Sequence, residues 1–138
     1  MADIDHFKLV NDNHGHSTGD EVIRRLAQEL VAEWPDRELV CRFGGEEFVT
    51  ICEETDAEGA LLLAERIRTE LEKTVFHSGG EELRCTCSIG IATFPLGGES
   101  WEELFKSADE ALYVSKRGGR NRCTVFAPGQ GPRSSHAA

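Results

Sequence analysis

Apolar side chains recur along this chain with the spacing of an amphipathic helix in three long segments. The first has Thr18 and Glu21 at its start, which is the pattern of a capping box, and Pro35 at its end. The second runs from Asp56 to Thr74, and the third begins after Ser100, a residue type favoured at helix N-caps. The pattern therefore predicts three amphipathic helices.

Shorter runs of β-branched and aromatic residues predict strands between these helices. Gly44-Gly45 is a two-residue hairpin signal between two such runs, and Gly79-Gly80 predicts a second turn. Residues 5–11 have room for one or two helical turns before a turn at 12–16. The predicted strands end at Ile4 or cover residues 39–43, 48–52, 83–94 and 122–126.

Helices and hairpins that mix without strict βα alternation favour an α+β domain, in which a sheet is flanked by helices. With 138 residues, the chain is expected to form one domain over residues 1–127. Residues 128–138 are rich in glycine, proline and serine and are expected to form a loose tail. A central strand that begins at residue 1 looks truncated, so we expect a domain shortened at its N-terminus.

Charge and composition narrow the function. Acidic residues outnumber basic ones by 25 to 15, a net charge of −10, and such a surface repels phosphate backbones, so no nucleic-acid partner is expected. Metal ions can still bridge carboxylates to a small phosphorylated ligand. No apolar run approaches the roughly 20 residues that span a bilayer, and no export signal is visible. We therefore expect a cytoplasmic protein whose five cysteines are reduced.

Two pairs of acidic residues are candidate metal ligands. Asp3-Ile4-Asp5 places two carboxylates at a strand end, where they suit Mg²⁺, although a residue capping the following turn explains an aspartate equally well. Gly44-Gly45 precedes Glu46-Glu47, so a ligand's phosphates can approach closely beside two carboxylates. A plain polar hairpin turn is the alternative.

Two further groups can bind a nucleotide. Asn11, His16 and Asp20 offer an amide and a carboxylate that can pair with the edge of a guanine, or else stabilise a turn and a helix start. Residues 116–122 hold the densest cluster of basic side chains, which suits phosphate oxygens and equally suits a helix C-terminus. Taken alone, each group is weak.

Their ordered combination closely resembles the GGDEF family of diguanylate cyclases, in its Gly-Gly-Glu-Glu-Phe form. The resemblance extends from Asp3 to about Val125. It is carried by Asp3-Ile4-Asp5-His6-Phe7-Lys8, Asn11-Asp12, Gly15-His16, Gly19-Asp20, Arg42-Phe43-Gly44-Gly45-Glu46-Glu47-Phe48, Ser88-Ile89-Gly90-Ile91-Ala92, Ala108-Asp109, Ala111-Leu112-Tyr113, Lys116-Arg117 and Gly119-Arg120-Asn121.

The resemblance implies a central, mostly antiparallel sheet with a ferredoxin-like core, as in nucleotide cyclases and polymerase palms. It also implies the condensation of two GTP into cyclic di-GMP and two pyrophosphates by a homodimer of such domains, with two Mg²⁺ (or Mn²⁺) ions per active site. The implied metal ligands are Asp3, Glu46 and the carbonyl of Ile4. The implied substrate-binding residues are Phe7, Lys8, Asn11, His16, Asp20, Gly44, Gly45, Lys116 and Arg120; those implied in catalysis are Glu46, Glu47, Lys116 and Arg120.

The chain departs from the family pattern in two places. The opening helix, an Asp-x-Leu-Thr turn and most of the first strand are missing. Pro35 and Glu38 stand where the family's product-inhibition site has arginine and aspartate, so we expect no inhibition by cyclic di-GMP through that segment. Two alternatives stay open: a module that binds GTP or a partner without turnover, and a palm-like nucleotidyl transferase that takes another base.

Overall fold

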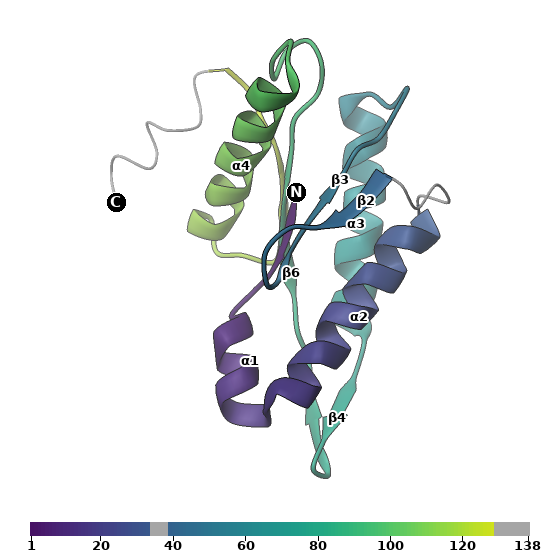
Figure 1. Cartoon of the computed structure of the whole chain (residues 1–138), viewed down its shortest axis with the longest axis vertical. Helices are drawn as coiled ribbons and strands as arrows, with labels where there is room; N and C mark the ends of the chain where they lie inside the picture. Colours follow the sequence, from purple (N-terminus) through teal and green to yellow (C-terminus); the bar gives the residue numbers. More distant parts are fainter. Residues whose placement is uncertain (34–38, 129–138) are drawn as a thin grey trace.

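The computed structural model describes residues 1–33 and 39–128. Its centre is a five-stranded sheet in the order β2-β3-β1-β6-β7, antiparallel except for the β6–β7 pair, with a separate β4–β5 hairpin. This confirms the predicted α+β class with its mostly antiparallel sheet. Figure 1 shows the N-terminus in the middle of the sheet and the β4–β5 hairpin projecting from the far end of the molecule. The elements are β1 (Ala2–Ile4), α1 (Phe7–His14), α2 (His16–Glu33), β2 (Val40–Arg42), β3 (Glu47–Thr50), α3 (Ala57–Lys73), β4 (Phe76–Ser78), β5 (Glu81–Leu83), β6 (Cys87–Ile91), α4 (Trp101–Arg117) and β7 (Cys123–Val125).

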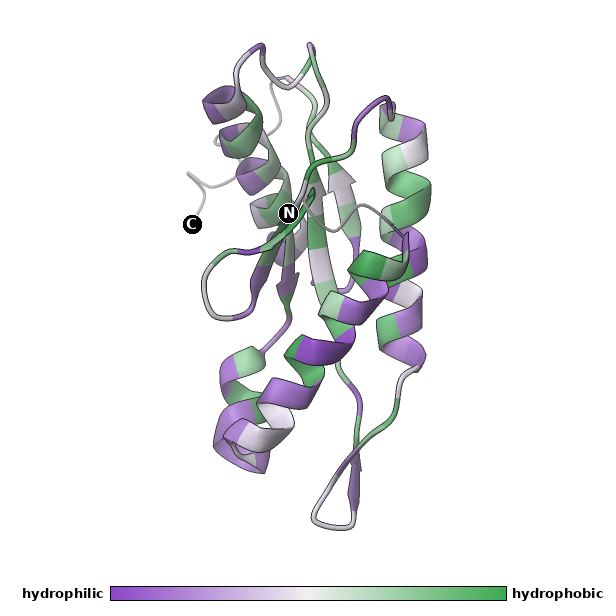
Figure 2. Cartoon of the chain, turned by 45° about the vertical axis from the view of Figure 1, so that its right-hand side comes forward, coloured by the Kyte–Doolittle hydropathy of each residue, from purple (hydrophilic) through white to green (hydrophobic). Residues whose placement is uncertain are grey.

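The two faces of the sheet differ because side chains alternate along each strand. Ala2 and Ile4 of β1 and Phe48 of β3 point into the apolar core, which they share with buried residues of α2 and α3. Asp3 lies between Ala2 and Ile4, so its side chain leaves the opposite face, where Lys116 of α4 contacts it. Figure 2 shows apolar colour concentrated on the central strands and on the inner sides of the helices. The apolar core therefore lies on one face and the candidate chemistry on the other.

Gly90 explains how α4 comes so close to the sheet. A side chain at this position would place a Cβ 2.2 Å from the carbonyl oxygen of Ala108 and 2.3 Å from the amide nitrogen of Leu112. Only glycine permits this approach. The sequence pattern indicated a break at Gly90, whereas the structure has it inside β6, and the break in the predicted 83–94 strand lies between Leu83 and Cys87.

One predicted helix start is wrong. Thr18 does not cap a helix but lies inside α2, where its hydroxyl donates to Ser78 at 3.1 Å, and it is buried. The helix begins at His16 because Gly15, with φ of 87°, provides the break after α1. Asp56 and Ser100 do cap α3 and α4, accepting hydrogen bonds from Gly59 and Glu103.

Two predictions fall outside the described residues: the helix end at Pro35 with the altered segment around it, and the tail from residue 129 on. Within the described residues, no helix has both the length and the apolar character that crossing a membrane requires.

Candidate active site

Asp3 occupies the central strand of the sheet. It pairs with Glu47 of β3 on one side and with Ser88 of β6 on the other, so the side chains of these residues share one face. Its carboxylate is buried, with 7% of the side chain exposed, and forms an ion pair with Lys116 at the end of α4. Burial raises the pKa of Asp3, while the hydrogen bond from Lys116 and the charges of Lys116 and Arg120 oppose the rise.

Glu47 is a second carboxylate on this face. Desolvation raises its pKa, and the charge of Asp3 directly across the ladder raises it further. Glu46 precedes it, half-buried, and its carbonyl oxygen accepts a hydrogen bond of 3.3 Å from the amide of Ile4. The backbones of the two distant stretches, 3–4 and 46–47, therefore lie side by side. Two partly desolvated carboxylates facing one another leave a concentration of negative charge that a cation would relieve.

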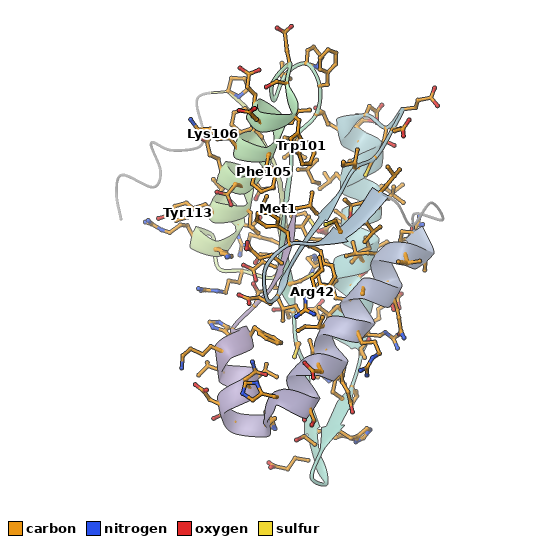
Figure 3. The ribbon with its side chains drawn as sticks, viewed as in Figure 1. Met1, Arg42, Trp101, Phe105, Lys106 and Tyr113 are labelled. Carbon is orange, nitrogen blue, oxygen red and sulfur yellow. The ribbon has the colours of Figure 1, made fainter. Side chains whose placement is uncertain are left out.

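The glycine loop is a hairpin, although it is longer than the two residues that the sequence pattern predicts. The β2–β3 ladder closes with Phe43 donating its amide to Glu47 at 2.7 Å, and Gly44 has φ of 84°. The guanidinium of Arg42 fixes the loop by donating two hydrogen bonds to the carbonyl of Gly45, at 3.1 and 2.7 Å. Arg42 is labelled beside this hairpin in Figure 3.

The hairpin also contacts α4. The ring of Phe43 meets that of Phe105 edge to face, with centroids 5.2 Å apart. In Figure 3, Phe105 lies on the side of α4 that faces the strands, while Tyr113 lies on the outer side. This contact ties the glycine loop to the helix whose last turn carries Lys116.

Basic side chains approach the carboxylates from the end of α4. Lys116 contacts Asp3, and the charge of Arg120 also acts on the Asp3 carboxyl. The side chain of Arg120 is exposed and belongs to the turn that follows the helix. The face therefore combines buried negative charge with adjoining positive charge, as a site for a metal-bound phosphate requires.

A second group of predicted binding residues lies between α1 and α2. The side-chain oxygen of Asn11 is buried and has no hydrogen-bond partner within the described residues. It lies against Gly19, where an added Cβ would come within 2.0 Å of it and within 3.1 Å of the ring of Phe7. Such close packing needs glycine, and a buried amide with a free polar atom is unusual unless a ligand completes it. The sequence analysis did not place Gly19 among the binding residues, although it stands next to Asp20.

Three other predicted binding residues lie at the surface. His16 and Asp20 are exposed at the start of α2. Lys8 is exposed and pairs with Asp12 one turn along α1, at 2.9 Å. Such an exposed pair contributes little to stability, so Lys8 is free to exchange Asp12 for another anion.

Asp5 belongs to a different environment from Asp3, although the sequence pattern treats them alike. Its carboxylate is buried and accepts hydrogen bonds from Thr86 at 2.7 Å, Ser88 at 2.6 Å and the amide of Asn121 at 3.0 Å. These donors leave little capacity for a metal ion. The sequence analysis offered Asp5, together with Asp3, as a candidate metal ligand, and the structure gives it a structural role instead, because fixed donors already occupy its carboxylate. It assigned Asn121 no role of its own.

The carboxylates of this face suit a hard divalent cation, because they offer oxygen atoms only and Mg²⁺ takes few protein ligands and keeps several waters. Within the described residues no three acidic, histidine or cysteine side chains already converge as a metal site, so the facing pair of Asp3 and Glu47 is the part of such a site that the structure brings together. A separate apolar cavity of about 410 Å³ is lined by none of the predicted site residues, so it does not belong to this chemistry.

Comparisons with known proteins identify the family of the chain. The family model described as "Diguanylate cyclase, GGDEF domain" matches residues 1–122. Over 125 residues the chain is 46% identical to diguanylate cyclase DgcP of Pseudomonas aeruginosa, a match that covers 91% of this chain and 18% of the relative. Over 127 residues it is 43% identical to diguanylate cyclase DosC of Escherichia coli K12, covering 91% of this chain and 27% of the relative. The chain thus spans about a quarter or less of these curated relatives.

Solved structures give the same answer for the fold. The active GGEEF domain of a diguanylate cyclase from Vibrio cholerae is 37% identical, with a TM-score of 0.84, and the match covers 93% of this chain and 81% of that one. The GGDEF domain of DgcB from Caulobacter crescentus, solved in complex with c-di-GMP, is 39% identical with a TM-score of 0.81, covering 90% of this chain and 74% of that one. This chain belongs to the GGDEF family of diguanylate cyclase domains.

Proposed function

We propose that the chain is a diguanylate cyclase domain that condenses two GTP into cyclic di-GMP and two pyrophosphates. The observation that carries the proposal is the pairing of Asp3 with Glu47 across the central ladder, beside Lys116 and Arg120. Family membership supports the reaction type. The proposed substrate places the reaction in the cytoplasm, where GTP is available.

GGDEF cyclases generally use a divalent metal. For this chain we propose two Mg²⁺ ions, or Mn²⁺, held by Asp3, the carbonyl of Ile4 and Glu46. When bound, the ions would neutralise phosphate charge and polarise the α-phosphorus. Glu47 faces Asp3 directly and is available to share this role.

The residues of the chain have separate tasks in this reaction. Asn11 and Asp20 would bind the guanine, and His16 belongs to the same substrate site. Lys116 and Arg120 would bind the triphosphate, lined also by Phe7 and Lys8, while Gly44 and Gly45 let its oxygens approach the backbone. Lys116 must then exchange the Asp3 carboxylate for a phosphate oxygen, which metal binding to Asp3 favours.

Each condensation forms one bond and breaks one. The 3′-oxygen of one GTP attacks the α-phosphorus of the other, the bond to the β-phosphate breaks, and pyrophosphate leaves. Glu46 is the proposed acceptor of the 3′-hydroxyl proton, with Glu47 as the second candidate. Two such steps close the ring. Because each domain would bind one GTP, two domains must meet, and alignment of the two nucleotides is the main contribution of the protein.

The test is incubation with GTP and Mg²⁺ over a range of protein concentrations, with chromatographic detection of cyclic di-GMP. The chain should form product, with a rate that rises more steeply than protein concentration because two domains must associate. Glu46→Gln should form none, and Glu81→Gln, which removes an exposed carboxylate on β5, should behave as the parent. Binding of GTP without product by the parent at every concentration would overturn the proposal in favour of a regulatory module.

A further inference from the structure

The turn after α4 carries two consecutive residues in an unusual backbone conformation. Arg120 has φ of 65° and Asn121 has φ of 49°, and neither is glycine. Left-handed backbone is unfavourable for arginine, and although asparagine adopts it more readily, two such residues in succession persist where the surrounding structure imposes them. The amide of Arg120 donates to the carbonyl of Ser115 at 3.0 Å, which folds the turn back onto the last turn of the helix.

Asp5 holds the backbone of this turn from the side of the sheet. Its carboxylate accepts the amide of Asn121 at 3.0 Å and is itself fixed by Thr86 and Ser88, at 2.7 and 2.6 Å. Asp5 is 6% exposed and Ser88 is fully buried, so these hydrogen bonds are shielded from water. The turn is thereby attached to β6 next to the strand end that carries Asp3.

Helix α3 holds the side chain of the same residue. Arg68 donates to the amide oxygen of Asn121 at 2.8 Å, and the amide nitrogen of Asn121 donates to Glu72 at 2.7 Å. Arg68 in turn donates to both carboxylate oxygens of Glu65, at 2.9 and 3.1 Å. Since arginine only donates and a carboxylate only accepts, the side-chain amide of Asn121 has a single orientation in this arrangement.

We propose that Asp5, Arg68, Glu72 and Asn121, the anchor cluster, are positioning residues that fix Arg120 for the triphosphate of the substrate. The inference rests on the proposed function, because it takes Arg120 as a phosphate-binding residue. Asn121 is held by hydrogen bonds to its backbone amide and to its side chain, and Arg120 directly precedes it in the chain. A guanidinium whose backbone is already ordered loses less freedom when it binds phosphate.

The polar atoms of the anchor cluster are already occupied, by one another and by Thr86, Ser88 and Glu65, so the cluster is not expected to contact the nucleotide itself. Arg120 itself is exposed, and its charge acts on Asp3. The cluster therefore acts through Arg120 on the substrate, and loss of the cluster should matter only while the Arg120 guanidinium is present.

The test measures binding of a GTP analogue with a methylene group between the α- and β-phosphates, which cannot be cleaved there, together with the GTP dependence of cyclic di-GMP formation. Arg68→Gln and Asn121→Gly should each weaken analogue binding about tenfold and raise the KM for GTP by a similar factor. Asn121→Gly removes the side chain but keeps a residue that tolerates left-handed backbone. It therefore tests the side-chain hydrogen bonds to Arg68 and Glu72 without changing the backbone conformation. Arg66→Gln is the matched control, since Arg66 lies on the same helix and pairs with Glu33 instead.

A double-mutant cycle separates positioning from general stability. In an Arg120→Ala background, Arg68→Gln should weaken analogue binding less than twofold further, because the group that it positions is absent. Equal losses with and without Arg120, or parental binding by both cluster variants, would overturn the inference while leaving the proposed function intact. If the parent neither binds the analogue nor makes cyclic di-GMP, the proposed function itself fails.

Discussion

Asp3 and Asp5 lie two residues apart at the end of β1, and both are buried, yet their carboxylates are neutralised differently. Asp5 accepts three hydrogen bonds from fixed donors: Thr86 just before β6, Ser88 on β6 and the amide of Asn121 in the turn after α4. Asp3 has one flexible partner, Lys116, and faces a second carboxylate, Glu47.

This difference indicates that Asp5 stabilises the fold, whereas Asp3 is available for binding and catalysis. A carboxylate with every oxygen satisfied by fixed donors stabilises the fold, whereas one held by a mobile cation can exchange that partner for a metal or a substrate. The raised pKa values of Asp3 and Glu47 indicate that the folded chain tolerates unfavourable charge on this face. Such local destabilisation is typical of functional sites.

The largest expected effect is the loss of turnover in Asp3→Asn. Without this carboxylate the metal ligand set is incomplete, so cyclic di-GMP formation should fall about a thousandfold. The free energy of unfolding should change by less than about 1 kcal/mol, because the lost ion pair involves a lysine that can reach solvent. Product assays and urea unfolding of the same preparation measure both. A variant that keeps its activity would remove Asp3 from the chemistry.

Asp5→Ala should, in contrast to Asp3→Asn, have its main effect on the free energy of unfolding. Three donors would lose a charged acceptor in a buried environment, so the free energy of unfolding should fall by about 3 kcal/mol. Urea unfolding with metal absent is the measurement. Asp12→Ala, which removes an exposed aspartate paired with Lys8, is the control and should change stability by less than about 0.5 kcal/mol. If the free energy of unfolding falls by less than about 1 kcal/mol in Asp5→Ala, then Asp5 does not stabilise the fold more than Asp3 does, and the comparison is wrong.

Gly19→Ala tests whether the packing against Asn11 serves nucleotide binding. The new methyl group would lie 2.0 Å from the Asn11 side-chain oxygen, so Asn11 must move and the KM for GTP should rise about tenfold. The clash also strains the packing of α1 against α2, so urea unfolding of the same variant is measured beside KM to show that it remains folded in the assay. Ser17→Ala on the exposed side of α2 should leave KM unchanged. An unchanged KM in Gly19→Ala would exclude a guanine contact at Asn11.

The smallest expected effect concerns Glu47→Gln. The pKa of Glu47 in the folded chain lies above its ordinary value of 4.5, so the folded chain holds this proton more tightly than the unfolded chain does. The free energy of unfolding therefore falls as the pH rises from 4.5 through the folded pKa. Removing the charge should therefore raise the melting temperature by about 2 °C at pH 7 without metal, and the gain should vanish below pH 4.5. Thermal unfolding at several pH values checks this. A gain that persists in acid would rule out charge as its cause.

The sequence by itself determined the fold class, the two long helices capped by Asp56 and Ser100, and the Gly79-Gly80 turn, because periodicity and capping chemistry are local. It also located the acidic and basic motifs of the candidate site. It misplaced the start of α2, because Thr18 and Glu21 fit a capping pattern that Gly15 overrides.

Only the tertiary structure decided which of these residues meet. Asp3 and Glu47 are 44 positions apart in the chain, and the register of β1 against β3 places them opposite each other. The approach of α4 over Gly90 brings Lys116 to Asp3. Two aspartates in one short motif acquired different tasks because Thr86, Ser88 and the amide of Asn121 all donate to Asp5, whereas Asp3 is held by Lys116. Such long-range hydrogen bonds depend on the packing of the whole domain, and no local pattern encodes them.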